Sequence, residues 1–289
     1  MTVYNLPDDI FSAEILAESI IIHDYAAQIG TFKGKSILHR NAISLVIAGE
    51  KTMQFAEKTV VVKDDELHFL SSGNCLASMD LSKQAVFRTI LIFFDDAVLS
   101  DFYVKYDTLI KALKTVKTAP EGYVFFKKDD FIYNFIASLT LILGNKQQLS
   151  MPMKSLKFEE LMLYLLERHP SVFLSFQPLK RTHSGDLSLR QVVETNITNT
   201  LTVEELAFLC NMSISTFKRQ FEKIYGNSPN KWMRQKRMTL AANLLKNQNT
   251  RPSDVFHQVG YENHSSFSQS FKQTFGKTPT DYQAEIMNA

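Results

Sequence analysis

The chain has 289 residues, of which 45% are hydrophobic, 22 are Phe and 8 are Pro. This length is typical of two domains, and the apolar content excludes a largely disordered chain. No basic region precedes an apolar stretch at the N-terminus, and no run of about 18 apolar residues follows, so we expect a cytosolic protein without a secretion signal or a membrane span. Two cysteines far apart in sequence, Cys75 and Cys210, are expected to be buried and reduced.

The net charge of +2 conceals an asymmetry along the chain. Residues Leu187 to Ala289 carry a net charge of +4 and the remainder carries −2. Within the C-terminal part, Lys218 to Arg251 holds nine basic residues and one acid, Glu222. Such a block is either a solvated helical face or a surface that binds phosphate, and charge alone favours the solvated face.

From Ile43 to Phe94 apolar and polar residues alternate, with short polar turns between the segments. The alternating apolar positions are Met53 and Phe55, Val60 and Val62, Leu67 and Phe69, then Cys75, Ala77 and Met79, and the apolar run from Thr89 to Phe94 ends the set. Short strands at regular spacing indicate an antiparallel sandwich or a small barrel.

Two amphipathic segments follow, Asp130 to Leu143 and Lys154 to Glu167, and the loop between them allows an antiparallel helical hairpin. Both are apolar over a wide face, so we expect them to pack on the strands alone or also against a second subunit. The stretch after Pro170 has the composition of a linker. We therefore expect a first domain over residues 1–170, a linker over 171–186 and a second domain over 187–289.

The C-terminal third contains an internal repeat. Phe217, Phe221, Tyr225, Gly226, Pro229 and Trp232 recur fifty residues later as Phe267, Phe271, Phe275, Gly276, Pro279 and Tyr282. Each copy predicts two short helices joined by a tight turn, over about 202–226 and 250–276. Thr202 with Glu205 predicts a capping box in the first copy, and Gly260 predicts the turn of the second. With a connecting helix after Ser228 and another capped by Ser188, about seven helices are expected.

The stretch from Leu201 to Tyr282, with LTVEELAFLCNMSISTFKRQFEKIYGNSP and VGYENHSSFSQSFKQTFGKTPTDY, resembles the DNA-binding region of AraC/XylS-type transcription regulators. The two helix-turn-helix units, the turn glycine and the paired G-x-x-P endings carry the resemblance. It implies an α+β protein of two domains, in which an N-terminal cupin-like β-barrel with a helical hairpin precedes an all-α double helix-turn-helix domain. One departure is Phe256, where the family usually has a small residue, so a ring must fit between two crossing helices.

A recognition helix places side chains in the major groove, where base edges present distinguishable donors and acceptors. The outward residues of the first unit are Ser215, Thr216, Lys218 and Arg219, and the resemblance implies that His264, Ser265, Ser268 and Gln269 take the same role in the second. Arg219 can donate twice to guanine, and Gln269 can bond adenine through both amide atoms. The alternative, strongest for the serines, is simple solvent exposure.

The connecting helix adds further basic residues. Lys231 and Lys236 are candidate phosphate contacts. Arg237 lies beside the apolar face, so it fits an internal pair with Glu204 or Glu205 at least as well as a contact to DNA.

A metal enzyme is the competing class, because cupins can hold a metal through two or three His and a carboxylate. The strand region offers only His39 and His68, without an H-x-H pair, and no nucleophile, phosphate-loop or C-x-x-C motif occurs. We therefore expect no catalysis, no cofactor and no metal. A small-molecule-binding protein with an accessory DNA-binding domain is the related alternative, and an architectural nucleoid protein is disfavoured because the basic charge is confined to one face.

The sequence thus predicts a sequence-specific transcription regulator that binds double-stranded DNA. We expect an activator, which would act on RNA polymerase, and a homodimer formed through the N-terminal helices. The order of the domains also resembles the type III secretion activators of this family, which a protein partner controls. The N-terminal domain is therefore expected to be gated by either a small molecule or a regulatory protein.

Overall fold

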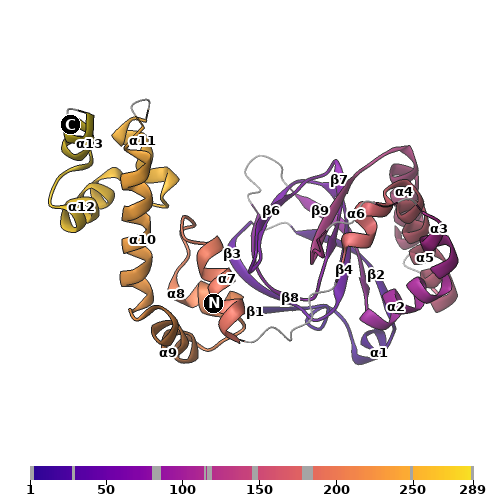
Figure 1. Ribbon diagram of the computed structural model, residues 1–289. Helices are drawn as coiled ribbons and strands as arrows, with labels where there is room; N and C mark the ends of the chain where they lie inside the picture. Colours follow the sequence, from indigo (N-terminus) through magenta and orange to yellow (C-terminus); the bar gives the residue numbers. More distant parts are fainter. Residues whose placement is uncertain are drawn as a thin grey trace. The chain divides into compact units, whose positions relative to one another are not determined.

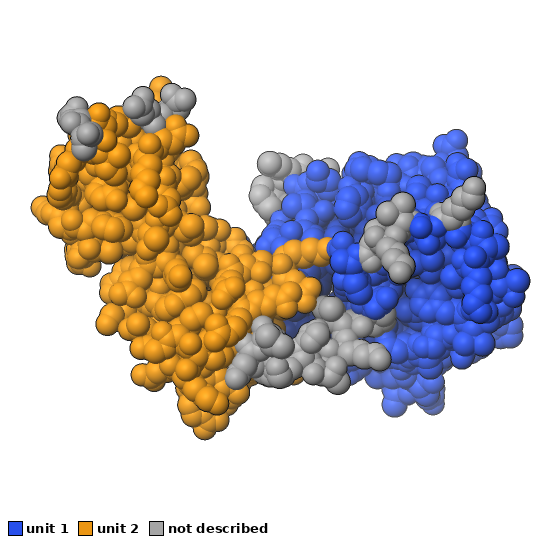
Figure 2. Space-filling view, in the orientation of Figure 1, with its two compact units in different colours: residues 1–55, 59–181 blue, residues 56–58, 182–289 orange. Residues whose placement is uncertain are grey.

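The structure of the chain is a computed structural model that describes residues 3–27, 30–79, 86–113, 115, 119–144, 149–177, 185–247 and 250–287. The chain divides into two compact units, Met1–Phe55 with Thr59–Arg181 and Ala56–Lys58 with Thr182–Ala289, coloured blue and orange in Figure 2. The strands of the described residues belong to the first unit, and the second unit is helical (Figure 1). No helix in these ranges is both long and apolar enough to cross a lipid bilayer.

Two five-stranded sheets build the first unit. One has the order β1-β3-β8-β5-β6 (Val3–Leu6, Thr31–Leu38, Gly73–Met79, Lys51–Gln54 and Thr59–Val62). The other has the order β10-β7-β4-β9-β2 (Tyr123–Lys127, Glu66–Leu70, Asn41–Ala48, Phe87–Phe94 and Ile20–Ala27). Over the described residues the edge strands of one sheet do not pair with those of the other. The expected cupin-like barrel is therefore a pair of separate sheets and not one closed barrel.

The central strand β9 shows why one segment is apolar without alternation. Ile90, Ile92 and Phe94 belong to the core that the second sheet forms with the helices. Leu91 and Phe93 belong to the core that the two sheets form together. Both faces of β9 are thus buried, and a strand buried on both faces has a near-continuous apolar sequence.

The strands predicted between residues 43 and 94 are confirmed as β4 to β9. The strands β1, β2, β3 and β10 lie outside that prediction. In β3 a bulge interrupts the pairing with β8 between Thr31 and Gly34, and Lys33 has a positive φ of 48°. Such an irregular strand with two lysines carries no clear period of two, which is why the sequence pattern does not reveal it.

The other elements of the first unit are the helices α1 (Ala13–Leu16), α2 (Asp96–Lys105), α3 (Asp107–Ala112), α4 (Asp130–Gly144), α5 (Met151–Arg168) and α6 (Pro170–Ser175). The predicted hairpin is confirmed as α4 and α5, which bury Phe135 and Leu165 against the second sheet. The linker expected over 171–186 differs at its start, because α6 is helical and Phe173 and Phe176 are buried in the same core. Residues 178–184 of that linker lie outside the described residues.

The second unit consists, in the part of the chain described, of α7 (Gly185–Thr195), α8 (Val203–Leu209), α9 (Ile214–Tyr225), α10 (Pro229–Leu244), α11 (Pro252–Gln258), α12 (His264–Phe275) and α13 (Pro279–Met287). This agrees with the expected set of helices, although α7 begins at Gly185, before the predicted cap Ser188. The long helix α10 contacts α9 on one side of the repeat and α11 and α12 on the other. It is the element that joins the two helix-turn-helix units.

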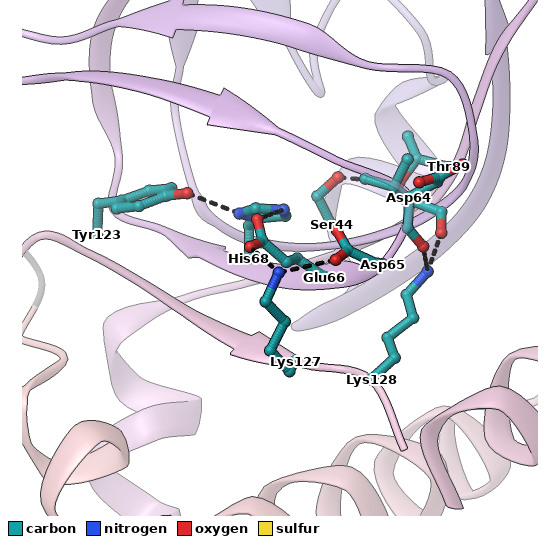
Figure 3. A network of polar contacts seen from close by, with 10 residues as sticks. Ser44, Asp64, Asp65, Glu66, His68, Thr89, Tyr123, Lys127 and Lys128 are labelled. Atoms are coloured by element: carbon teal, nitrogen blue, oxygen red, sulfur yellow. Dashed lines mark hydrogen bonds and ion pairs between the residues drawn. The ribbon is translucent and has the colours of Figure 1, made fainter. Parts of the chain in front are cut away.

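A polar network lies on β7 and β10 of the first compact unit, with His68 buried and Lys127 exposed (Figure 3). His68 is fully buried, and its Nδ1 lies 2.7 Å from the hydroxyl of Tyr123. The Glu66 carboxylate lies 3.7 Å from His68 Nε2 and binds Lys127 Nζ at 2.7 Å. Burial lowers the pKa of His68 to about 4, so this imidazole is neutral at pH 7.

Candidate nucleic-acid interface

The first helix-turn-helix unit consists of α8 and α9, and side chains cap both helices. Thr202 Oγ1 accepts a hydrogen bond from Glu205 N at 3.2 Å, and Glu205 Oε2 accepts one from Thr202 N at 2.7 Å, which is the predicted capping box. Ser213 Oγ accepts from Thr216 N at 3.2 Å and so fixes the start of α9. Between the helices, Asn211 takes a left-handed conformation with φ 55°, which asparagine tolerates better than most residues.

The second helix-turn-helix unit, α11 and α12, repeats this geometry. Tyr261 N donates to Phe256 O at 2.9 Å, the same bond and length as Met212 N to Ala207 O in the first unit. Gly260 takes the left-handed position with φ 78°, and Asn263 caps α12 by accepting from Ser266 N at 2.8 Å. The sequence repeat is therefore a repeat of backbone hydrogen bonds and caps as well as of apolar residues.

Both second helices bury a pair of phenylalanines and present polar residues on the opposite face. Phe217 and Phe221 of α9 and Phe267 and Phe271 of α12 are completely buried. Both helices end at a left-handed glycine, Gly226 or Gly276. The residues proposed to read bases come from the outward faces that this burial leaves.

In the first unit the four predicted residues are brought onto one end of α9. Lys218 and Arg219 are exposed and make no hydrogen bond or ion pair within the described ranges, so both are available to a ligand. Ser215 is exposed, with its hydroxyl 3.0 Å from that of Ser213. The hydroxyl of Thr216 accepts from Ser213 at 2.9 Å and is half-buried, so Thr216 is the least available of the four.

The second unit places its four predicted residues on the first turns of α12. His264, Ser265 and Gln269 are exposed and Ser268 is half-buried. Phe256 stands where the family usually has a small residue. Its ring is half-buried and packs edge to face on the His264 ring, with 5.9 Å between the ring centres. Phe256 thus contacts the start of the recognition helix while the turn keeps the hydrogen bond seen in the first unit.

The connecting helix α10 divides its basic residues into two kinds. Lys231 is exposed, and Lys236 is exposed with its ammonium 5.2 Å from the centre of the Trp232 ring. A cation over an aromatic face is weakly held, so Lys236 can still reach a phosphate. Arg237 is half-buried and donates to three backbone carbonyls, so the internal role expected for it is correct but the expected pairing with Glu204 or Glu205 is wrong.

No group of three or more His, Cys, Asp and Glu side chains that could hold a metal ion occurs within the described residues. His39 instead meets the side-chain oxygen of Asn5 at 3.1 Å, and His68 meets Tyr123. Both cysteines are buried, and burial raises the pKa of each thiol to about 12. Among the described residues, the polar and basic outer faces of the second compact unit, α7 to α13, are therefore the strongest candidate site.

Comparison with known families decides between the classes left open by the sequence. The profile of the ExsA N-terminal regulatory domain matches residues 41–176, and that of a helix-turn-helix domain matches residues 206–285. The chain is an AraC-type transcription regulator. It therefore binds DNA and regulates transcription, and the metal-enzyme alternative is excluded because this family does not consist of enzymes.

Relatives of this AraC-type regulator align over most of its length. The transcriptional regulator ExsA of Pseudomonas aeruginosa is 25% identical over 241 residues, which cover 82% of this chain and 84% of ExsA. The virulence regulon transcriptional activator VirF of Yersinia enterocolitica is 24% identical over 245 residues, covering 83% of this chain and 88% of VirF. Among solved structures, apo ToxT of Vibrio cholerae covers 93% of this chain and is itself covered to 98%, at 14% identity and a TM-score of 0.39.

Gln283, which the sequence did not single out, and Arg237 hold the DNA-binding domain of this AraC-type regulator together from within. Gln283 of α13 is buried, and its amide nitrogen lies 2.8 Å from Thr250 O, 3.2 Å from Leu245 O and 3.3 Å from Asn247 O, at the end of α10 and the loop after it. Arg237 binds carbonyls in the same manner. Backbone carbonyls are the same in every residue, so no sequence pattern marks their partners.

Proposed function

We propose that this regulator activates transcription by reading a two-part DNA site, with α9 in one major groove and α12 in the next. The observation that carries the proposal is the repeated geometry, in which each unit ends in a capped helix with a polar outer face. Recognition helices of helix-turn-helix proteins contact bases with their N-terminal residues, and successive grooves on one side of DNA lie about 34–36 Å apart. The name of VirF as an activator supports activation over repression.

In this proposal the base contacts come from Ser215, Thr216, Lys218 and Arg219 of α9 and from His264, Ser265, Ser268 and Gln269 of α12. Arg219 is free to form two parallel hydrogen bonds to guanine, and Gln269 is able to do the same with adenine. Lys231 and Lys236 neutralise phosphates, which adds affinity without sequence preference.

Substitution of Arg219 tests the proposal. A duplex is first selected by the full-length protein from a random library, and Kd is then measured on this duplex and on random DNA. Arg219→Ala should weaken binding to the selected duplex by about 1–3 kcal/mol and relax the preference at one guanine. Lys231→Ala, the matched control, should weaken both duplexes equally and lower the salt slope by about one. Equal losses on both duplexes for Arg219→Ala would remove it from the base-reading residues.

The homodimer is proposed to form through the α4–α5 hairpin. Several large apolar side chains on the outer side of this hairpin are exposed, which are Tyr133, Leu141, Met153 and Leu156. Leu141 is 73% exposed and Leu156 is 59% exposed, and clustered exposed apolar residues mark interaction surfaces. A second copy of the same hairpin would cover them in a two-fold symmetric contact.

The first compact unit is proposed to be the regulatory one, where a regulatory protein or a small molecule binds and changes dimerisation or DNA binding. The match to the ExsA N-terminal regulatory domain supports a regulatory role for residues 41–176. We place the protein in the cytoplasm, where it meets DNA and RNA polymerase. Contact with RNA polymerase is required of it if it activates transcription.

A further inference from the structure

We infer that Arg237 is a positioning residue that holds the two recognition helices at a fixed separation and angle, and so determines which spacing between half-sites the protein accepts. The inference rests on the proposed function, in which both α9 and α12 enter the major groove. Arg237 itself need not touch DNA for this role.

Arg237 projects from the middle of α10 and binds two segments that are far apart in sequence. Its Nε donates to Ile197 O at 2.6 Å and its Nη2 donates to Asn199 O at 2.7 Å, both in the segment between α7 and α8. Its Nη1 donates to Gly260 O at 3.3 Å, in the turn between α11 and α12. One planar guanidinium therefore joins the entrance of the first unit to the turn of the second.

The two segments that Arg237 bridges also touch each other directly. A Cβ atom built on Gly260 would lie 2.2 Å from Thr198 O, so the backbones meet at a distance that admits only glycine. Thr198 stands between the two acceptors Ile197 and Asn199. The turn of the second unit thus rests on the segment that leads into α8, and Arg237 binds both at this contact.

The chemistry of Arg237 fits a fixed connection better than a contact to DNA. Its fork of N–H groups has a rigid geometry, and three of its donors are used by carbonyls within the protein. Ile197 and Asn199 follow the C-terminal end of α7, where the helix dipole favours a positive charge. Arg234, one turn earlier on α10, is exposed and makes no hydrogen bond or ion pair with the described residues, so it supplies a matched comparison.

A rigid contact between the two helix-turn-helix units restricts the number of base pairs that can separate the two half-sites, because DNA is helical. Each base pair added between two half-sites moves one of them by about 3.4 Å and rotates it by about 35°. A protein with rigidly connected units therefore accepts one spacing, whereas loosely connected units accept several. Loss of the Arg237 bonds should relax this selection and leave the base preference within each half-site unchanged.

The test measures binding of the full-length protein to the duplex selected from a random library and to versions with one or two base pairs inserted or deleted between its halves. Wild type should prefer its own spacing by about tenfold over a one-pair change, a loss similar to that of one mismatched base pair. Arg237→Lys and Arg237→Ala should reduce this preference to below about threefold, with the Lys variant retaining the fold. Arg234→Ala should weaken all spacings alike. Equal weakening at every spacing by the Arg237 variants would overturn the inference.

If the selected duplex has only one half, the proposed two-part reading is wrong. A second measurement, made on the protein without DNA, still tests the role of Arg237. Because Cys75 and Cys210 are buried, cysteines introduced at the exposed positions Lys223 of α9 and Thr274 of α12 can be spin-labelled selectively. The distance distribution between the two labels in the free protein should be narrow with Arg237 and broad with Arg237→Lys, at an unchanged far-UV circular dichroism. An equally narrow distribution in the variant would overturn the positioning role.

Discussion

Gly260 lies directly against the backbone of Thr198, so closely that a Cβ atom would stand 2.2 Å from the Thr198 carbonyl oxygen and 2.8 Å from its carbonyl carbon. Gly260 also has a φ of 78°, which side chains rarely adopt. Two independent reasons thus require glycine at this turn, the left-handed backbone and the lack of room. By contrast Gly226, the left-handed glycine that ends α9, has a φ of 67°, and an added Cβ would have no atom within 4 Å other than those of its chain neighbours.

This difference predicts unequal costs for two identical substitutions. Gly260→Ala should lower the free energy of unfolding of the second compact unit, α7 to α13, by about 2–5 kcal/mol, from backbone strain together with overpacking. Gly226→Ala should cost about 1–2 kcal/mol, from strain alone. Urea unfolding followed by the fluorescence of Trp232, the single Trp of the chain, measures both. Equal losses would mean that the contact with Thr198 relaxes freely.

The charge distribution predicts that the first helix-turn-helix unit together with the connecting helix α10 supplies most of the affinity. Lys218 to Arg251 carries a net charge of +8, and Pro252 to Ala289 carries −2. Affinity from released counterions follows the number of phosphates neutralised. Joint substitution of Lys218 and Arg219 by Ala should nearly abolish binding and lower the salt slope by about one to two.

The matched double variant lies in the second unit. Joint substitution of His264 and Gln269 by Ala should leave most of the affinity and hardly change its salt dependence, because it removes no Lys or Arg that could neutralise a phosphate. Titrations of the selected duplex at several salt concentrations compare the two. If the second pair proves as damaging as the first, α12 anchors the complex as much as α9 does, and the predicted dominance of α9 is wrong.

Much of the candidate site could be predicted because its signals are local. Thr202 with Glu205, Ser213 and Gly226 form the caps and the stop that their spacing predicts, since a cap involves residues only a few positions apart. The repeat then transfers the same elements to α11 and α12. Whether the outward side chains of these helices read bases stays a prediction.

The parts that could not be predicted depend on contacts between distant segments. β1 pairs with β3 in parallel across a separation of about thirty residues, and neither strand has a regular apolar period. The internal acceptors of Arg237 are backbone carbonyls, which have no residue identity to recognise, so an acidic partner was the natural but wrong expectation. The same reason hides Gln283.

The exposed apolar face of the α4–α5 hairpin predicts that a charged side chain placed on it makes the protein monomeric. Leu141→Glu or Leu156→Glu should shift the full-length protein from dimer to monomer in sedimentation analysis, because a buried unpaired carboxylate opposes association. Val104→Glu is the control, since Val104 is 78% exposed on α2 and outside the hairpin. A dimer that survives both hairpin substitutions would place its interface elsewhere.

Buried His68 predicts a dependence of stability on pH. Burial lowers its pKa to about 4, whereas a histidine in an unfolded chain titrates near 6.5. Between these values the unfolded chain binds a proton that the folded chain does not, so the stabilisation is complete above about pH 6.5 and is lost as the pH falls toward 4. Comparison by far-UV circular dichroism with His68→Gln, which does not titrate, should show wild type losing about 2 kcal/mol more between pH 7 and pH 5. Equal losses would mean that His68 is protonated without cost in the folded protein.

In the proposed function, α9 and α12 each read one half of a two-part DNA site. The most direct measurement selects binding sites from a random duplex library with wild type, Arg219→Ala and Gln269→Ala in parallel and compares the enriched sequences. We expect wild type to enrich two short motifs about one helical turn apart, Arg219→Ala to lose a guanine in one motif, and Gln269→Ala to lose an adenine in the other. Enrichment of the same unaltered motifs by all three proteins would contradict base reading by these two helices.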